Sequence, residues 1–201
     1  MDNINNILDN DEQIIKSYKP NRFRMIFLAL VPTLIFFLAG VAMFVFGLLG
    51  IFGIIQFVDK DTGVHDITGP IILLIMGAVF MSVLFGTLIT NSLSYKKTKY
   101  YVTNKRIIIS HGVIGIDYKS LALESILAID VRVDFVDKLV RPNTGTIMFG
   151  SAAMPMMRTN NSSGSISGYT FAYIENPYEA YKEIKELIKK WHSFYKKVIL
   201  L

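Results

Sequence analysis

Two adjacent stretches without a charged residue decide the fold of this chain: MIFLALVPTLIFFLAGVAMFVFGLLGIFGIIQFV at Met25–Val58 and ITGPIILLIMGAVFMSVLFGTLITNSLSY at Ile67–Tyr95. Each stretch is longer than the ~20 apolar residues that a helix needs to cross ~30 Å of hydrocarbon. We therefore expect two transmembrane helices, spanning roughly residues 25–57 and 69–93 and joined by a short external loop.

The Lys and Arg residues around these stretches predict an orientation. Arg22 and Arg24 precede the first stretch, and Lys96, Lys97 and Lys99 follow the second, whereas the connector holds a single Lys. Because positively charged flanks stay on the cytoplasmic side, we expect a two-pass protein of the inner (cytoplasmic) cell membrane with both termini in the cytoplasm. The expected parts are a cytoplasmic N-terminal segment at residues 1–24, a membrane hairpin at 25–95 and a cytoplasmic domain at 96–201.

The composition agrees with this division. Charged residues make up 18% of the chain, below the roughly 25% that is typical of soluble proteins. The segment after Tyr95 carries sixteen Lys and Arg residues against nine Asp and Glu residues. A basic domain can indicate nucleic acid, but beside two membrane spans the anionic headgroups of membrane lipids are the nearer explanation, so we expect no nucleic-acid partner. Cysteine is absent, which excludes disulfides and thiolate metal sites.

The second span carries small residues at four-residue spacing, which places them on one helix face. Such a row lets two helices approach closely and is a candidate helix-packing seam. It fits either packing against the first span, near Gly40 and Gly47, or a contact between copies of the chain. Neither span contains an ionisable residue, which argues against an ion or proton pathway. The residues of the row are Ala78, Ser82, Gly86, Thr90 and Ser94.

After the spans, short β-branched and aromatic runs alternate with turn residues, which predicts strands. An amphipathic helix is expected at residues 177–199, with Asn176 as N-cap and Pro177 at its first position. The order of strands followed by one helix predicts a mainly-β domain, a small antiparallel barrel or sandwich capped by a C-terminal amphipathic helix. The expected strands are Thr98–Val102, Arg106–Ser110, Gly115–Leu123, Ala128–Phe135, Gly145–Gly150 and Tyr169–Ile174.

Several of these segments resemble one family. The run YYVTNKRIII at Tyr100–Ile109, followed by Gly112-Val113-Ile114, is similar to the first hairpin of the bacterial pleckstrin-homology-like (PH-like, "membrane-flanked") domains. The resemblance continues through Leu121–Val133, Gly145-Thr146 and FAYIENP at Phe171–Pro177, and it covers roughly residues 96–190. It implies a fold of about seven strands with a C-terminal helix, no enzyme activity, and association with a second copy or a similar membrane protein. The longer, polar stretch Ser151–Gly168 departs from the family pattern.

Basic residues mark two candidate sites of membrane or lipid contact. Lys97, Lys99, Lys105 and Arg106 lie at the membrane exit and in the first hairpin turn, where eukaryotic PH domains dock inositol phosphates. The alternative is an ordinary positively charged flank and a solvated turn. Lys196 and Lys197 lie in the tail, where basic and apolar residues interleave; Phe194 onward is expected to extend beyond the domain toward membrane or a partner.

Catalytic chemistry finds little support in the sequence. The three His residues are far apart, and no phosphate-binding loop, metal-ligand spacing or nucleophile motif is present. Asp130, Asp134 and Asp137, with Arg132, are expected on a solvated strand face. We therefore expect no enzyme activity, metal or cofactor. The favoured interpretation is a membrane-anchored interaction or assembly module; the alternative is a domain that binds or senses anionic lipid headgroups.

Overall fold

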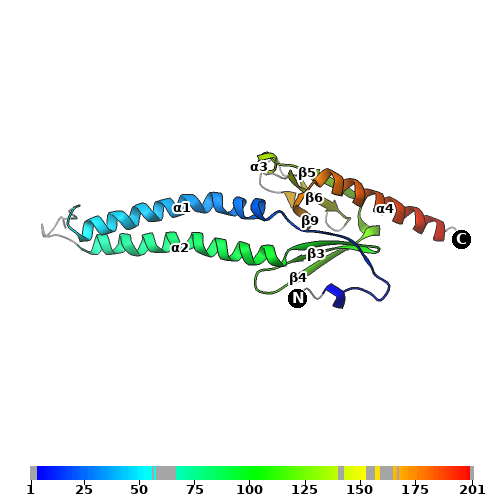
Figure 1. Cartoon of the computed structure of the whole chain (residues 1–201), viewed down its shortest axis with the longest axis horizontal. Helices are drawn as coiled ribbons and strands as arrows, with labels where there is room; N and C mark the ends of the chain where they lie inside the picture. The colour runs from blue at the N-terminus through cyan, green and yellow to red at the C-terminus, as the bar shows by residue number, and fades with distance from the viewer. Residues whose placement is uncertain are drawn as a thin grey trace. The chain divides into compact units, whose positions relative to one another are not determined.

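The computed structural model of the chain (Figure 1) describes residues 4–55, 57, 67–139, 143–152, 157–158, 165–166 and 168–199. The chain forms two compact units, one of residues 26–92 and one of residues 1–25 together with 93–201. Most of the expected external connector and most of the stretch 151–168 lie outside the described residues.

The two long apolar helices are confirmed as α1 (Arg22–Ile51) and α2 (Thr68–Lys97). Only 17% of the most apolar part of α1 and 6% of that of α2 is buried. A core helix of a soluble domain would instead be covered by its neighbours. Both helices are long and apolar enough to cross a membrane.

α1 ends earlier than expected, at Ile51, in a Gly-rich stretch that includes Gly53 with φ of +70°. Residues other than Gly rarely adopt this left-handed conformation, so the helix stops there. The two helices touch through Gly40 and Gly77: a Cβ atom added to Gly77 would lie 2.7 Å from the carbonyl oxygen of Gly40. The close approach of the backbones therefore depends on this glycine pair.

Among the described residues, the other unit contains two larger antiparallel sheets and the two-stranded pair β7-β8. The first has the order β1-β2-β3-β4, and the second has the order β5-β6-β9. The strands of the first sheet are β1 (Ile14–Tyr18), β2 (Lys99–Thr103), β3 (Arg106–His111) and β4 (Asp117–Ala122). Those of the second are β5 (Ala128–Arg132), β6 (Thr144–Gly150) and β9 (Tyr169–Glu175). The remaining elements are the 3-10 turns η1 (Ile4–Asn6) and η2 (Leu123–Ser125), the short helix α3 (Phe135–Leu139), the two-residue strands β7 (Met157–Arg158) and β8 (Ser165–Ile166), and α4 (Pro177–Ile199).

The core of this unit lies between the two sheets and α4. Phe171 stacks on Tyr100 with ring centroids 4.8 Å apart and meets Phe149 edge-on at 4.9 Å. From α4, Ala180, Ile184 and Ile188 are buried at four-residue spacing, so one stripe of the helix covers the core. The expected mainly-β domain with a C-terminal amphipathic helix is therefore confirmed.

The position of β1 corrects the expected topology. Residues 14–18 precede the helices in sequence but pair with β2, with Tyr18 opposite Tyr100. The Tyr100–Ile109 segment forms the β2–β3 hairpin, as expected, but β2 also pairs with β1, and the helical hairpin is inserted between these two strands. As an edge strand with mostly exposed side chains, β1 lacks the alternation that marks a half-buried strand. Lys16 and Tyr18 also hydrogen-bond to Glu183 of α4.

The expected strand Ala128–Phe135 is too long. β5 ends at Arg132, and α3 begins at Phe135, which is 75% exposed. Asp137 is not on a solvated strand face but is buried in α3. The other five expected strands agree with the structure to within two residues at each end.

Candidate interaction surface

An open groove runs between β5 and α4. Its cavity volume is about 370 Å³, within the range of ordinary ligand pockets, ~300–1,000 Å³. It is lined by the loop before β5, by the start of β5 and by one face of α4. The lining residues are Ile126, Leu127, Ala128, Ile129, Tyr181, Lys185, Ile188, Lys189 and His192.

The floor of this groove and the edge that Leu127 forms are apolar. Ile126 and Ile188 are buried and belong to the core cluster, so the floor continues the domain core. Leu127 is 72% exposed although its backbone N–H donates to the carbonyl of Gly150, which fixes its position. An exposed leucine on fixed backbone beside buried apolar residues offers an anchoring point for an apolar side chain.

The α4 side of the groove is basic. Lys185, Lys189 and His192 follow each other at four- and three-residue spacing, which places them on one helix face. Lys185 donates to the hydroxyl of Tyr181 at 3.1 Å and lies 5.2 Å from the centre of its ring. No Asp or Glu is among the nine lining residues, so the groove combines an apolar floor with a positively charged rim.

β5 forms the other wall, and it is an edge strand. Among the described residues, β6 is the only strand that pairs with β5, with Ile129 opposite Phe149 and Val131 opposite Ile147. The backbone groups on the other side of β5 are therefore not used by a sheet ladder. Such an edge is a template for pairing with another extended chain.

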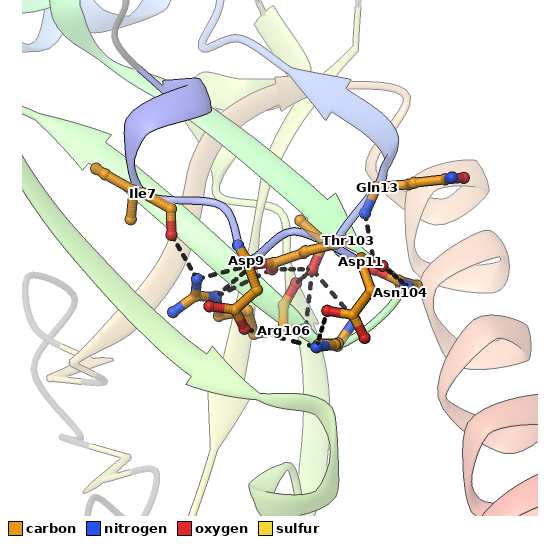
Figure 2. A network of polar contacts seen from close by, with 9 residues as sticks. Ile7, Asp9, Asp11, Gln13, Thr103, Asn104 and Arg106 are labelled. Carbon is orange, nitrogen blue, oxygen red and sulfur yellow. Dashed lines mark hydrogen bonds and ion pairs between the residues drawn. The ribbon is translucent and has the colours of Figure 1, made fainter.

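A second feature is the polar network that holds the N-terminal segment on the β2–β3 turn (Figure 2). The side chain of Glu12 is fully buried. Its carboxylate accepts hydrogen bonds from Arg106 at 2.8 Å and from Thr103 at 2.6 Å. Burial opposes ionisation, but the hydrogen bonds from Arg106, Thr103 and the backbone N–H of Asp9 outweigh it and lower the pKa of Glu12 to about 2.

The turn itself is held by the same segment. Asn104 accepts from the backbone N–H of Gln13 at 2.9 Å and donates to the carbonyl of Asp11 at 3.1 Å. Lys105 forms ion pairs with Asp11 and Asp9, and its hydrogen bond to Asp11 lowers the pKa of that carboxyl. The structure thus places Lys105 and Arg106, both expected to contact lipid, against acidic partners in the N-terminal segment.

A third feature is a buried ion pair between Arg24 and Asp137. Asp137 also accepts from the hydroxyl of Thr144 at 3.1 Å and from the backbone N–H of Asp134 at 2.8 Å. The Arg24 guanidinium lies 4.9 Å from the ring centre of Tyr173, while its buried Nη1 atom has no hydrogen-bond partner among the described residues. These contacts fix the start of α1 to α3, β6 and β9.

The other predicted site residues are scattered. Lys97 donates to the carbonyls of Ile114 and Gly115, and Lys99 is half-buried at the start of β2. The structure does not gather these two with Lys105 and Arg106, since Lys97 ends α2 and Lys99 begins β2, whereas Lys105 and Arg106 follow the other end of β2. The side chains of Lys196 and Lys197 lie outside the described residues.

The small-residue row lies away from the contact between α1 and α2. Gly77, one residue before the row, faces Gly40, whereas a Cβ atom added to Gly86 would meet nothing within 4 Å. The hydroxyl groups of Ser82 and Thr90 donate to backbone carbonyls of their own helix. Ala78, Ser82, Gly86 and Thr90 are all exposed in the single chain.

A second groove opens where β1 leads into α1, with a cavity volume of about 670 Å³. Lys19 and Arg22 contribute positive charge to it, and Arg22 lies 6.0 Å from the ring centre of Tyr95. Glu175 also lines it and accepts a hydrogen bond from Asn21 at 2.9 Å. This arrangement offers a mixed but partly basic surface beside the start of α1.

The partners in these features could not be predicted from the sequence, because they are distant in the chain. Glu12 and Arg106 are separated by 94 residues, and Arg24 and Asp137 by 113. One local pattern was available: the spacing of Lys185, Lys189 and His192 already places them on one face of a helix. No comparable local pattern in the sequence indicates that β5 forms the other wall of the groove.

Comparison with known proteins gives one finding. A family model described as "Bacterial PH domain" matches residues 25–186, which is more than half of the chain. No curated protein and no solved structure matches the sequence.

Proposed function

Because this chain belongs to the bacterial PH domain family, we propose that it is a membrane-anchored, non-enzymatic interaction module at the cytoplasmic face of the bacterial cell membrane. Its two sheets and α4 would form a PH-like barrel, α1 and α2 would cross the membrane, and both termini would be cytoplasmic, as the flanking Lys and Arg residues predict. Its partner would be a second copy or a similar membrane protein.

The observation that carries this proposal is the double connection between the helices and the β domain. β1 ends at Tyr18 and α1 begins at Arg22, and α2 ends at Lys97 while β2 begins at Lys99. With α1 and α2 in a bilayer, two short connections would hold the domain close to the membrane surface. Weak contacts between neighbouring domains then gain from a high effective concentration.

The test is to crosslink the protein in native membranes and to measure the mass of the intact complex after gentle solubilisation. We expect a defined assembly that contains a second copy or another membrane protein. Glu12→Gln, which loosens β1 and thereby one of the two connections, should reduce the crosslinked fraction. A single chain without neighbours above background in native membranes would overturn the proposal.

The second candidate function, binding of anionic lipid headgroups, is favoured by the partly basic groove at Lys19 and Arg22. Each positive charge near an anionic surface contributes ~1 kcal/mol of attraction. The test is native mass spectrometry of the full chain released from nanodiscs of mixed phosphatidylcholine and phosphatidylglycerol. Selective retention of phosphatidylglycerol that is lost in Lys19→Glu supports this function, and equal retention of both lipids rejects it.

A further inference from the structure

We propose that the groove between β5 and α4 binds an extended acidic peptide segment of a partner protein, which adds to β5 as a further strand. This inference rests on the proposed function and names the surface and the chemistry of the partner. The backbone of the segment would pair with β5, its apolar side chains would cover Leu127, and its carboxylates would face Lys185 and Lys189.

The backbone of β5 decides the extended form of the ligand. In the described part of the chain, β5 pairs with β6 on one side only. A strand of five residues at ~3.3 Å per residue offers roughly 16 Å of edge with which no further described strand pairs. A peptide that pairs with this edge satisfies alternate backbone groups on both chains, which is the basis of recognition by strand addition.

The side chains decide the composition of the ligand. Leu127 is 72% exposed beside a floor that includes the buried residues Ile126 and Ile188. When an apolar side chain of the peptide covers Leu127, the apolar surfaces of both side chains are removed from water, which favours association. The rim carries Lys185, Lys189 and His192 and no acidic residue among the lining residues, so carboxylates complement it.

A lipid headgroup is the less fitting occupant. A headgroup would use the charges of Lys185 and Lys189 but not the unpaired edge of β5 or the exposed Leu127. An extended chain uses all three features together. Anionic lipid is therefore retained as an outcome of the test that would overturn the proposal.

The test uses the full chain in nanodiscs of neutral phosphatidylcholine. The probe is a panel of blocked eight-residue peptides made of Glu, Val and Leu in several orders, with net charge −3. Two control panels replace every Glu by Lys or place Pro at alternate positions. Binding is followed by fluorescence of Trp191, the only Trp of the chain, and by amide hydrogen exchange of Ala128–Arg132.

We expect peptides of the acidic panel to bind and to slow exchange of the β5 amides, and the Lys panel not to bind. The Pro panel should bind at least about tenfold more weakly, because Pro has no N–H to pair with β5. The double variant Lys185→Glu/Lys189→Glu should weaken binding at least about tenfold. The matched control Lys182→Glu/Lys190→Glu makes the same charge change on α4 at exposed residues outside the groove and should alter affinity less than about twofold.

Several outcomes would overturn the proposal. They are equal binding of the acidic and Lys panels, equal loss in the control variant, unchanged exchange of the β5 amides in every acidic complex, and protection of the groove by phosphatidylglycerol nanodiscs alone. Retention of the native assembly in the Lys185→Glu/Lys189→Glu variant, together with failure of the peptides, rejects this groove while leaving the proposed interaction function standing. If the unaltered chain forms no assembly in native membranes, the proposed interaction function itself is rejected.

Discussion

Arg24 and Asp137 form an ion pair whose two side chains are each only 2% exposed, although 113 residues separate them in sequence. Arg24 lies in the first turn of α1, and Asp137 lies in α3. A charged pair so far from water is tolerated only because each partner neutralises the other and further hydrogen bonds satisfy Asp137. The pair therefore fixes the point at which the chain leaves the β domain.

Replacing Asp137 by Asn should strongly destabilise the β domain. The substitution leaves the buried Arg24 charge without its counter-ion, and breaking a buried pair in this way typically costs about 3–5 kcal/mol. The measurement is the melting temperature of the full chain in nanodiscs, followed by Trp191 fluorescence. Asp134→Asn is the matched control, because the Arg132–Asp134 pair is 31% and 43% exposed and such pairs contribute less than ~1 kcal/mol. Similar losses in both variants would contradict the special role of the buried pair.

Glu12→Gln should release the N-terminal segment from the β2–β3 turn. The neutral amide has no negative charge and only one acceptor oxygen, whereas Arg106 donates to both carboxylate oxygens of Glu12, so the substitution should cost roughly 2 kcal/mol. We expect faster amide hydrogen exchange in β1 and β2, with little change in the more distant β9. Asp11→Asn, at the exposed pair with Lys105, should have little effect on the same amides. Unchanged exchange in β1 after Glu12→Gln would show that the strand pairing alone holds the segment.

The stability of the β domain should depend on pH below the ordinary pKa of a glutamate side chain. The pKa of Glu12 is lowered from 4.5 to about 2, so its ionised form stabilises the folded state. This contribution is fully present above about pH 4.5 and is lost as the pH falls toward 2. Melting temperatures measured between these limits should fall more steeply for the unaltered chain than for Glu12→Gln. Parallel curves for the two proteins would contradict this assignment.

Gly77→Leu should disrupt the contact between α1 and α2, whereas Gly86→Leu should not. A Cβ atom at Gly77 would lie 2.7 Å from both the Gly40 carbonyl oxygen and the Phe44 backbone nitrogen, which cannot move aside as a side chain can. At Gly86 the same atom meets nothing within 4 Å. Distances between spin labels on the two helices in nanodiscs should increase only for Gly77→Leu.

The same pair of variants separates the two interpretations of the small-residue row. If Ala78, Ser82, Gly86 and Thr90 form a contact between copies, Gly86→Leu should lower the mass of the intact complex while the spin-label distances within one chain stay unchanged. An unchanged mass would remove this row as a contact between copies. Separation of the helices by Gly86→Leu would contradict the position of Gly86 outside the contact between α1 and α2.

Much of the local structure could be predicted from the sequence. Length and apolarity identify α1 and α2 because these are properties of one continuous segment and its solvent. β2, β3, β4, β6, β9 and the start of α4 also follow from local alternation, turn residues and the Asn176-Pro177 pair. β1 was missed because an exposed edge strand has no apolar face that marks it, and the end of β5 was missed because alternation continued past Arg132 into α3.

Little of the candidate surface could be predicted in this way. The basic face of α4 is visible in the spacing of Lys185, Lys189 and His192, but its facing wall, Leu127 and β5, comes from another part of the chain. Likewise, Lys105 and Arg106 look like free basic residues until the N-terminal segment brings Asp11 and Glu12 against them. The charge of a residue is read from the sequence, whereas its partner is not.

Two long apolar helices and a mainly-β domain with a C-terminal helix follow from the sequence alone, because periodicity and segment length are local quantities. The pairing of β1 with β2, which completes the first sheet although the helical hairpin lies between them in sequence, appears only in the folded chain. The folded chain also brings Arg24 to Asp137 and places β5 across an open groove from α4. Those pairings form only when the whole domain buries its core, so their physical cause is packing between distant segments rather than any local pattern.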